Sequence, residues 1–256
     1  MSLVRVHGQL RNLNWRPSRP NQNAKIWQPK RRMVKPPAFI DPLDLNTPLA
    51  IWDQGQLGSC TAHGTGFVFA YRIWKTHGIM FMPARLFIYY CERMIEGDVD
   101  QDAGAQVSDG LDSLLKYGCP PESEWPYDIS QFATEPPQTC WIDGLKEVGL
   151  EKNAVQCTVD MIRQSLLADL PVTLGFTVFA SFMNQSVADT GVMPMPKDGE
   201  EVEGGHCVAV VAYNDDNKTF TCRNSWGASW GKAGRFTIPY DFLSNCSDAW
   251  NLPKVA

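Results

Sequence analysis

The stretch Asp53-Gln-Gly-Gln-Leu-Gly-Ser-Cys60-Thr-Ala joins a glycine-containing turn to a run of small and apolar residues. That run continues to Trp74 at helical spacing, and Gly78 is typical of a position where a helix ends. We therefore expect a buried helix that begins at Cys60. At a helix start, free N–H groups and the positive dipole end favour a thiolate over a thiol. Gln54 is suited to donate, with the Cys60 N–H, to a developing oxyanion.

A thiolate nucleophile needs a proton partner, and His206 is the best candidate. It begins a buried apolar run, which is followed by a polar turn at 214–217 and a second run that ends at Asn224. A hairpin centred on residue 215 would place His206 opposite Asn224, whose oxygen would fix the imidazole tautomer. Trp226 would cover that hydrogen bond and exclude water. Structural or surface roles are expected for the other histidines, His7, His63 and His77.

The order of predicted elements favours an α+β fold. Helices are expected at 60–78, 83–96, 105–117 and 158–168, and strands at 172–178, 206–213, 219–224 and 234–238. Prolines across 118–144 predict a connecting loop. Because helices come first and strands second, we expect two lobes and no alternating parallel sheet.

Charge divides the chain into a basic N-terminal arm, residues 1–35, and an acidic body, residues 36–256. The arm holds nine Lys or Arg and no acidic residue, which leaves 14 basic against 28 acidic residues in the body. Its proline-rich, aperiodic sequence predicts an extended or weakly ordered segment on a surface. We hypothesise that it lies across the acidic body. A solvated tail, or an anchor for an anionic partner, is the alternative.

Composition narrows the partners and cofactors. The chain is 44% hydrophobic and 20% charged, and no apolar run approaches bilayer length, so we expect a soluble protein without a membrane partner. The eight cysteines are unevenly spaced and form no Cys-x-x-Cys pair, which favours reduced, buried thiols. The sequence shows no metal cluster, phosphate loop or base-reading module, so neither a cofactor nor nucleic acid is expected. The first residues lack an apolar export signal, and the compartment stays open.

Three motifs resemble the signature blocks of papain-like cysteine peptidases. They are Gln54-Gly-Gln-Leu-Gly-Ser-Cys60, Gly205-His-Cys-Val-Ala-Val-Val-Ala-Tyr213 and Arg223-Asn-Ser-Trp-Gly-Ala-Ser-Trp-Gly-Lys-Ala-Gly234. Further stretches are similar to the bacterial branch of that family: Pro83-Ala-Arg-Leu-Phe-Ile-Tyr-Tyr, Asp102-Ala-Gly-Ala and the run from Tyr117 to Tyr127.

The resemblance implies a fold and an activity. It implies a helical lobe at about 53–145 carrying Cys60, a β-barrel-like lobe at about 146–240 carrying His206 and Asn224, and termini that cross between the lobes. A monomeric endopeptidase would hydrolyse peptide bonds through a Cys60 thioester in the cleft between them. The resemblance implies that Gly104 and Ala105 form a ledge that pairs with the substrate backbone, and that Gly175 and Cys207 line the pocket for the second residue before the cut. Trp226 is also counted among the substrate-binding residues. The arm would then partly occlude the cleft.

The departures from the family pattern surround the nucleophile. Leu57 and Asp102 stand where relatives often have a disulfide, Thr61 replaces a tryptophan, and Gly205 replaces an acidic residue or Asn. Whether Cys91 and Cys140 pair is left open. Two alternatives also stay open: a non-catalytic peptide-binding protein on this fold, and a Cys-His acyltransferase or amidase of another class.

Overall fold

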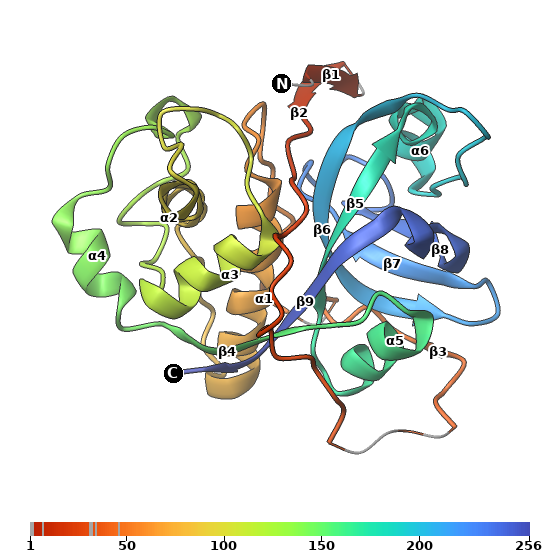
Figure 1. The fold of residues 1–256 in the computed structure, drawn as a ribbon, viewed down its shortest axis with the longest axis horizontal. Helices are drawn as coiled ribbons and strands as arrows, with labels where there is room; N and C mark the ends of the chain where they lie inside the picture. The colour runs from red at the N-terminus through yellow and green to blue at the C-terminus, as the bar shows by residue number, and fades with distance from the viewer. Residues whose placement is uncertain (1–2, 7, 31–32, 34, 46) are drawn as a thin grey trace.

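The computed structural model describes residues 3–6, 8–30, 33, 35–45 and 47–256. Helices gather on one side of the molecule and strands on the other, with one long helix between them (Figure 1). The two-lobe α+β prediction is therefore confirmed. The expectation for His7 lies outside the described residues.

The helical lobe is built around α1 (Cys60–His77), whose start and end follow the predicted signals. Gly78 ends the helix in the left-handed conformation, with φ 71°, and its N–H bonds to the Trp74 carbonyl. Only glycine adopts that conformation without steric cost. The other helices of this lobe are α2 (Arg85–Glu96), α3 (Val107–Lys116), η1 (Ile129–Gln131) and α4 (Gln138–Gly144).

The β lobe contains an antiparallel sheet with the strand order β4-β9-β5-β6-β7-β8 and with β3 paired to β6. In the described residues no pairing joins β4 to β8, so the sheet is open and the expected barrel-like closure is absent. Its strands are β3 (Phe39–Ile40), β4 (Gly149–Ala154), β5 (Val172–Phe179), β6 (Val202–Asn214), β7 (Thr219–Arg223), β8 (Arg235–Pro239) and β9 (Cys246–Val255). Helices α5 (Val159–Leu167), η2 (Ala180–Met183), α6 (Gln185–Thr190) and η3 (Tyr240–Asn245) complete the lobe.

Some elements differ from the sequence prediction. The helix α4 lies inside the predicted loop, because Pro137 precedes it and blocks no helical hydrogen bond. The strand β9 was missed, since its Pro253 argues against a central strand. Leu252 and Pro253 fall between the paired residues Asn251 and Lys254, at a register shift against β4. The proline is thus accommodated at a bulge.

The hairpin that carries the candidate histidine has a different register from the predicted one. Val210 pairs with Cys222 and Ala212 with Thr221, so a shift falls at Val211. On this register His206 lies beyond the last paired residue of β7, and its direct partner is Phe176 of β5. The prediction that His206 and Asn224 are opposite neighbours on paired strands is therefore wrong.

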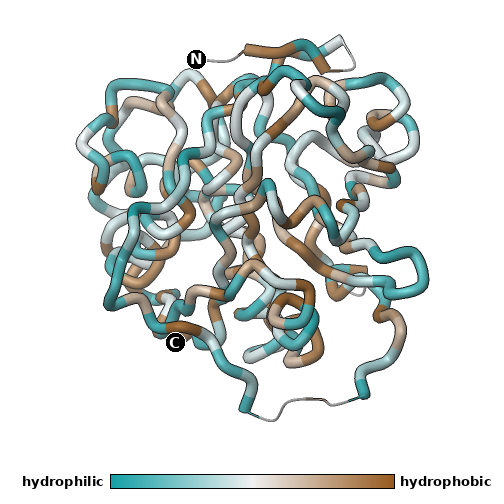
Figure 2. The backbone as a smooth tube through the Cα atoms, turned by 45° about the vertical axis from the view of Figure 1, so that its right-hand side comes forward, coloured by the Kyte–Doolittle hydropathy of each residue, from teal (hydrophilic) through white to brown (hydrophobic). Residues whose placement is uncertain are grey.

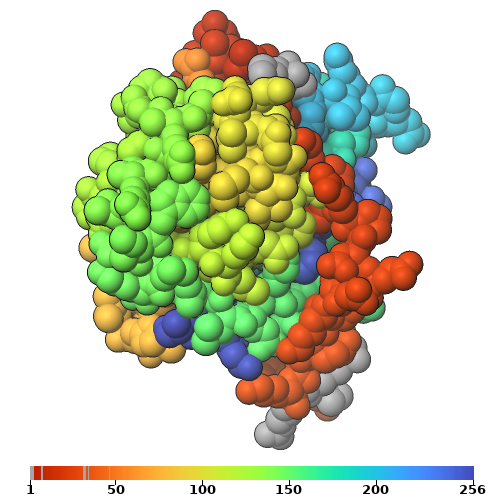
Figure 3. Space-filling model, turned by 60° about the vertical axis from the view of Figure 1, so that its left-hand side comes forward, coloured from red at the N-terminus to blue at the C-terminus, as the bar shows by residue number. Residues whose placement is uncertain are grey.

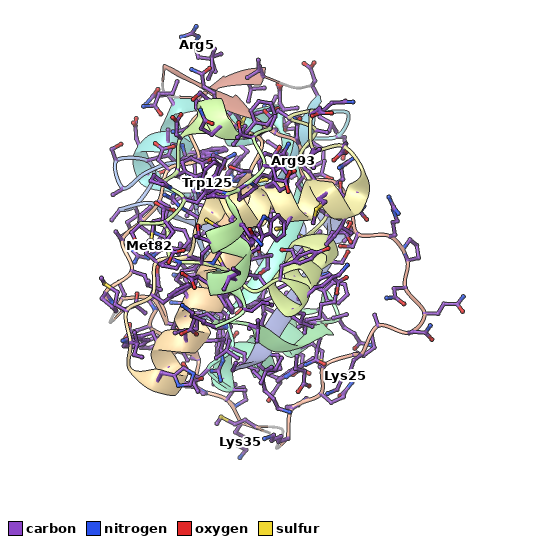
Figure 4. All side chains as sticks on the ribbon, turned by 90° about the vertical axis from the view of Figure 1, so that its left-hand side faces the viewer. Arg5, Lys25, Lys35, Met82, Arg93 and Trp125 are labelled. Atoms are coloured by element: carbon purple, nitrogen blue, oxygen red, sulfur yellow. The ribbon has the colours of Figure 1, made fainter. Side chains whose placement is uncertain are left out.

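The described residues of the arm include paired strands and buried side chains. Strands β1 (Leu3–Val6) and β2 (Gln9–Asn12) form a hairpin, and the chain then runs extended between the two lobes (Figure 1). In space-filling view it lies beside the segment coloured yellow, which contains α2 (Figure 3). Arg5 lies at one end of the molecule and Lys25 and Lys35 near the other (Figure 4). The predicted extended course is confirmed. The surface position is wrong in part, because apolar arm side chains join the core: Leu13, Trp15 and Trp27.

Two hydrophobic clusters hold the lobes together. One packs α1 against α2 and α3, and the other fills the space between the sheet and its flanking helices. Peripheral loops are mostly hydrophilic along the backbone tube (Figure 2). Among the described residues, no helix combines the length and apolarity needed to cross a membrane.

Candidate active site

Cys60 is the first residue of α1 and is completely buried. The preceding loop is tied to the body through Ser59, whose hydroxyl lies 2.6 Å from the Tyr127 hydroxyl. Tyr127 in turn donates to the Gln54 carbonyl at 3.0 Å. This arrangement fixes the turn that delivers the thiol to the helix N-terminus, as the sequence predicted.

His206 and Asn224 meet through their side chains. The Nε2 atom of His206 lies 2.8 Å from Oδ1 of Asn224, which also accepts the Ser225 N–H at 2.9 Å. The oxygen therefore selects the tautomer with a proton on Nε2. The other ring nitrogen, Nδ1, is buried and has no hydrogen-bond partner among the described residues. Trp226 stacks on the imidazole, with ring centroids 4.8 Å apart, and shields the bond to Asn224 from water.

The candidate nucleophile contacts the backbone next to the candidate histidine. The N–H of Cys207, the residue after His206, donates a hydrogen bond to the Cys60 sulfur. The start of α1 and the start of the buried part of β6 are thus in contact across the two lobes. The thiol, imidazole and amide predicted from the sequence are brought into one site.

Gln54 is buried and its amide has a fixed orientation. Its Oε1 accepts from the Ser225 hydroxyl at 2.6 Å, and its Nε2 donates to the Leu57 carbonyl at 2.9 Å. The amide nitrogen therefore faces the loop before Cys60, where an oxyanion donor is needed. Sequence reasoning missed Ser225, although it lies inside the Asn-Ser-Trp-Gly block that was singled out.

Burial makes the uncharged forms of the thiol and imidazole favourable in this conformation. Desolvation raises the pKa of Cys60 to about 12, against opposing hydrogen bonds from backbone N–H groups of Cys207 and Thr61. Desolvation lowers the pKa of His206 to about 4, while the Asn224 hydrogen bond opposes the shift and the Arg11 charge adds to it. The pair is therefore neutral near pH 7 as long as the site stays covered.

Four of the residues implied to bind substrate are in contact with the arm: Gly104, Ala105, Gly175 and Trp226. The Arg16 N–H donates to the Ala105 carbonyl, and the Trp15 N–H donates to the Gly205 carbonyl, both at 3.1 Å. The arm thus forms backbone hydrogen bonds with both lobes. At Gly104, which has φ 70°, a Cβ atom would lie 1.9 Å from the Asn14 carbonyl oxygen.

The indole of Trp15 packs onto glycine backbone. A Cβ atom at Gly175 would lie 2.2 Å from its Cε2, and one at Gly205 would lie 2.6 Å from its Cε3. The missing side chains at these two positions make the space that the ring fills. The departure at Gly205 noted in the sequence therefore has a steric reason. Cys207 of β6 is buried and pairs with Gly175 of β5, and its Sγ would lie 3.0 Å from a Cβ at Gly64 of α1.

Arg11 of the arm binds near the candidate histidine. Its guanidinium pairs with the Asp53 carboxylate and donates to the carbonyls of Gly55 at 3.1 Å and Trp226 at 3.3 Å. Burial opposes the charge of Asp53, yet hydrogen bonds from Arg11 and from the Gly55 N–H hold its pKa below the ordinary value. The basic sequence of the arm predicted contacts with the acidic body, but not this buried position.

The described residues hold no group of three or more His, Cys, Asp and Glu that could bind a metal. All eight cysteines are free thiols, so Cys91 and Cys140 do not pair here. A cavity of about 610 Å³ lies away from Cys60 and is lined by residues that include Lys25, Trp27, Arg72 and Gln164. It contains none of the candidate site residues.

Comparison with known proteins decides the family. A family model described as papain family cysteine protease matches residues 39–249. The chain belongs to this family. The papain-family protease is 40% identical over 219 residues to the uncharacterized peptidase C1-like protein L477 of Acanthamoeba polyphaga mimivirus, covering 79% of this chain and 69% of that protein. It is 27% identical over 208 residues to cysteine proteinase 3 of Entamoeba histolytica, covering 76% of this chain and 60% of the relative.

A solved structure agrees with the sequence relatives. The protease is similar to xylellain, a cysteine protease from Xylella fastidiosa, with a TM-score of 0.87, 31% identity and full coverage of both chains. The prediction of a papain-like peptidase is confirmed at the level of the family. Its catalytic and substrate-binding residues are assigned below as proposals.

Proposed function

We propose that this protease is an endopeptidase in which Cys60 is the nucleophile, His206 the acid–base partner and Asn224 the residue that orients the imidazole. The Cys60 sulfur attacks the peptide carbonyl and its proton passes to His206 Nδ1. The N–H of Cys60 and the Gln54 amide bind the oxyanion. As the C–N bond breaks, His206 protonates the leaving amine. Water then hydrolyses the thioester, with His206 as base, and the thiol is restored.

The observation that carries this assignment is the hydrogen bond from His206 Nε2 to Asn224 Oδ1, with Nδ1 left for the thiol. Without an orienting partner, a buried histidine near a thiol would be an ordinary core residue. The stacked Trp226 ring and the contact from the Cys207 N–H to the Cys60 sulfur support the same assignment.

Endopeptidase activity is supported by how the arm passes the candidate nucleophile. Residues 11–16 contact Asp53, Gly205 and Ala105, and the chain continues beyond both ends of that stretch. A surface that accommodates an extended chain on both sides of the reacting thiol suits internal cleavage. An exopeptidase would need a barrier at one end.

We further propose that the arm inhibits the enzyme. It contacts Gly205 next to His206 and occupies the positions assigned to substrate, with Gly104 and Ala105 as the backbone ledge, and its ion pairs use the opposite charges of arm and body. Among the described residues the pairs are Arg11–Asp53, Arg16–Glu96, Arg16–Asp98 and Lys25–Glu151. Deleting residues 1–35 should raise turnover of small peptides. That advantage should shrink at high salt, because screening weakens the exposed pairs of the intact chain.

The pocket occupied by Trp15 suggests the preferred substrates. Gly175 and Gly205 leave space for a flat aromatic ring, and the buried Cys207 is the sheet partner of Gly175. We therefore expect an aromatic residue at the second position before the cut. Gly175→Val should reduce that preference.

A peptide-library digest with wild type and Cys60→Ala, scored by mass, tests the assignment. We expect internal cuts, enriched in aromatic residues two positions upstream, and no cuts by the variant. Cleavage that persists in Cys60→Ala would contradict the nucleophile. Release of single terminal residues would indicate an exopeptidase. The absence of cleavage by the arm-deleted chain, provided it is folded, would favour the binding protein or an amidase acting on other amides.

A further inference from the structure

The Asp102 carboxylate joins the loop before the nucleophile to the predicted substrate ledge. The Gly58 N–H donates to its Oδ1 at 2.9 Å and to its Oδ2 at 3.2 Å. The Tyr89 hydroxyl of α2 donates to Oδ1 and accepts the Gly104 N–H at 3.2 Å. One carboxylate therefore fixes backbone two residues before Cys60 and, through Tyr89, the backbone of Gly104.

The arm binds the same residue twice. Asn12 Nδ2 donates to the carboxylate oxygen Oδ2 at 2.6 Å, and Asn14 Nδ2 donates to the Asp102 carbonyl at 2.8 Å. The Asn12 side chain is nearly completely buried, and its own oxygen has no partner among the described residues. Its amide is thus placed for the donation to Asp102. A hydrogen bond to a charged acceptor is stronger than one between neutral groups.

We propose that Asp102 is a positioning residue that holds the nucleophile loop and the ledge together and also serves as the docking point for Asn12 of the arm. This inference rests on the proposed inhibition by the arm. Asp102 stands in the position where relatives often carry a disulfide, and its carboxylate can form and break a hydrogen bond with Asn12. When the arm leaves, Asp102 keeps the Gly58 and Tyr89 bonds, and its Oδ2 retains only the longer bond from the Gly58 N–H.

Exchange of the two side chains gives a sharp test, because it reverses the direction of one hydrogen bond. In Asp102→Asn the amide oxygen can still accept from Gly58 and Tyr89, but its NH₂ group faces the NH₂ group of Asn12. In Asn12→Asp two carboxylates face each other. In the double variant N12D/D102N, the new Asn donates to the new Asp, and the contact is restored.

The readout is the rate at which iodoacetamide alkylates Cys60 in the full-length chain, measured by mass spectrometry. Trp15→Ala serves as the reference for an unseated arm. We expect each single variant to speed alkylation about tenfold or more, since a hydrogen bond to a charged group is lost, and N12D/D102N to return toward the wild-type rate. A double variant whose effect equals the product of the single effects would overturn the proposal.

Asn12 variants keep the test decisive should Asp102→Asn fail to fold. Asn12→Ala only deletes the donor, whereas Asn12→Asp adds repulsion, so the Asp variant should open the arm further. Equal rates for both would overturn the docking role. If neither differs from wild type while Trp15→Ala is fast, Asp102 does not hold the arm although the arm inhibits. If Trp15→Ala is also slow, the proposed inhibition itself fails.

Steady-state kinetics separates the two roles of Asp102. Because the arm would compete with substrate, Asn12→Ala should lower the apparent KM for a fluorogenic peptide and leave kcat unchanged. Asp102→Ala should also lower kcat, because the Gly58 loop loses its acceptor. An unchanged kcat in a folded Asp102→Ala protein would overturn the positioning role.

Discussion

The side-chain amide of Asn224 binds Nε2 of His206 at 2.8 Å although the two residues are not paired in the sheet. Asn224 follows the last residue of β7, where the strand has ended and the chain can turn its amide toward the imidazole. The hydrogen bond, and not the ladder register, is therefore what sets the orientation of the ring.

Replacing Asn224 should affect turnover more than substrate binding. In Asn224→Ala the ring loses its tautomer selection, and we expect kcat to fall about 100-fold with little change in KM. Asn217→Ala, in the exposed turn of the same hairpin, is the matched control. Initial-rate measurements on the arm-deleted or unseated enzyme would check this, and an unaltered kcat would argue against the orienting role.

Trp15→Ala should activate the intact chain. The indole is buried against Gly175 and Gly205, and removing a buried tryptophan commonly costs several kcal/mol, about 3–5. Part of that loss destabilises the seated position of the arm, so kcat/KM for a peptide should rise at least tenfold through a lower apparent KM. Trp15→Phe should rise less. If both variants stay folded and show the kcat/KM of wild type, Trp15 does not hold an inhibiting arm in place.

Acid should loosen the arm. Burial lowers the pKa of His206 to about 4 in the covered site, whereas an uncovered histidine has a pKa near 6.5. Between these values the released state binds a proton that the seated state does not, so seating is fully stable above about pH 6.5 and weakens as pH falls toward 4. Amide hydrogen exchange of Trp15 and Arg16, corrected for intrinsic rates, should show less protection at pH 5 than at pH 7.

The matching control is His206→Gln, in which protection of the same amides should vary less over this interval. Equal protection of wild type at both pH values would show that His206 does not control seating. The positive charge of Arg11 also lowers the pKa of His206 in the seated state, so it acts in the same direction as burial.

Asp44 should be important for stability. Its carboxylate is completely buried and accepts from Arg223 and Arg235 at 2.9 Å each. Asp44→Ala would leave the buried Arg223 guanidinium without its counter-ion, next to Asn224 in the chain. We expect a loss of about 3–5 kcal/mol in the free energy of unfolding, measured with urea. Asp41→Ala, at an exposed position, should change it by less than about 0.5 kcal/mol.

The proposed catalytic residues could be brought together from the sequence because each belongs to a short local motif. Cys60 begins a helix with clear apolar spacing, and His206 and Asn224 flank one hairpin. The sites that were missed depend on contacts between distant segments. Nothing local marks Asp102 as a partner of Gly58 and Asn12, and the aperiodic arm gave no signal for the buried position of Trp15.

Long-range pairing also explains the errors in the fold. The strand β9 pairs with β4 and β5, far away in sequence, and its polar residues and Pro253 hide it from local propensity. The register of β6 and β7 depends on a bulge at Val211 that turn arithmetic does not reveal.

Alkylation of the eight cysteines tests the central assignment most directly, with the other seven as internal controls. Peptide mapping after brief iodoacetamide treatment of Trp15→Ala should find Cys60 modified at least tenfold faster than any other cysteine. That preference should disappear in Trp15→Ala/His206→Ala. Modification of Cys60 no faster than the remaining thiols, in a folded protein with the arm unseated, would contradict its role as the nucleophile.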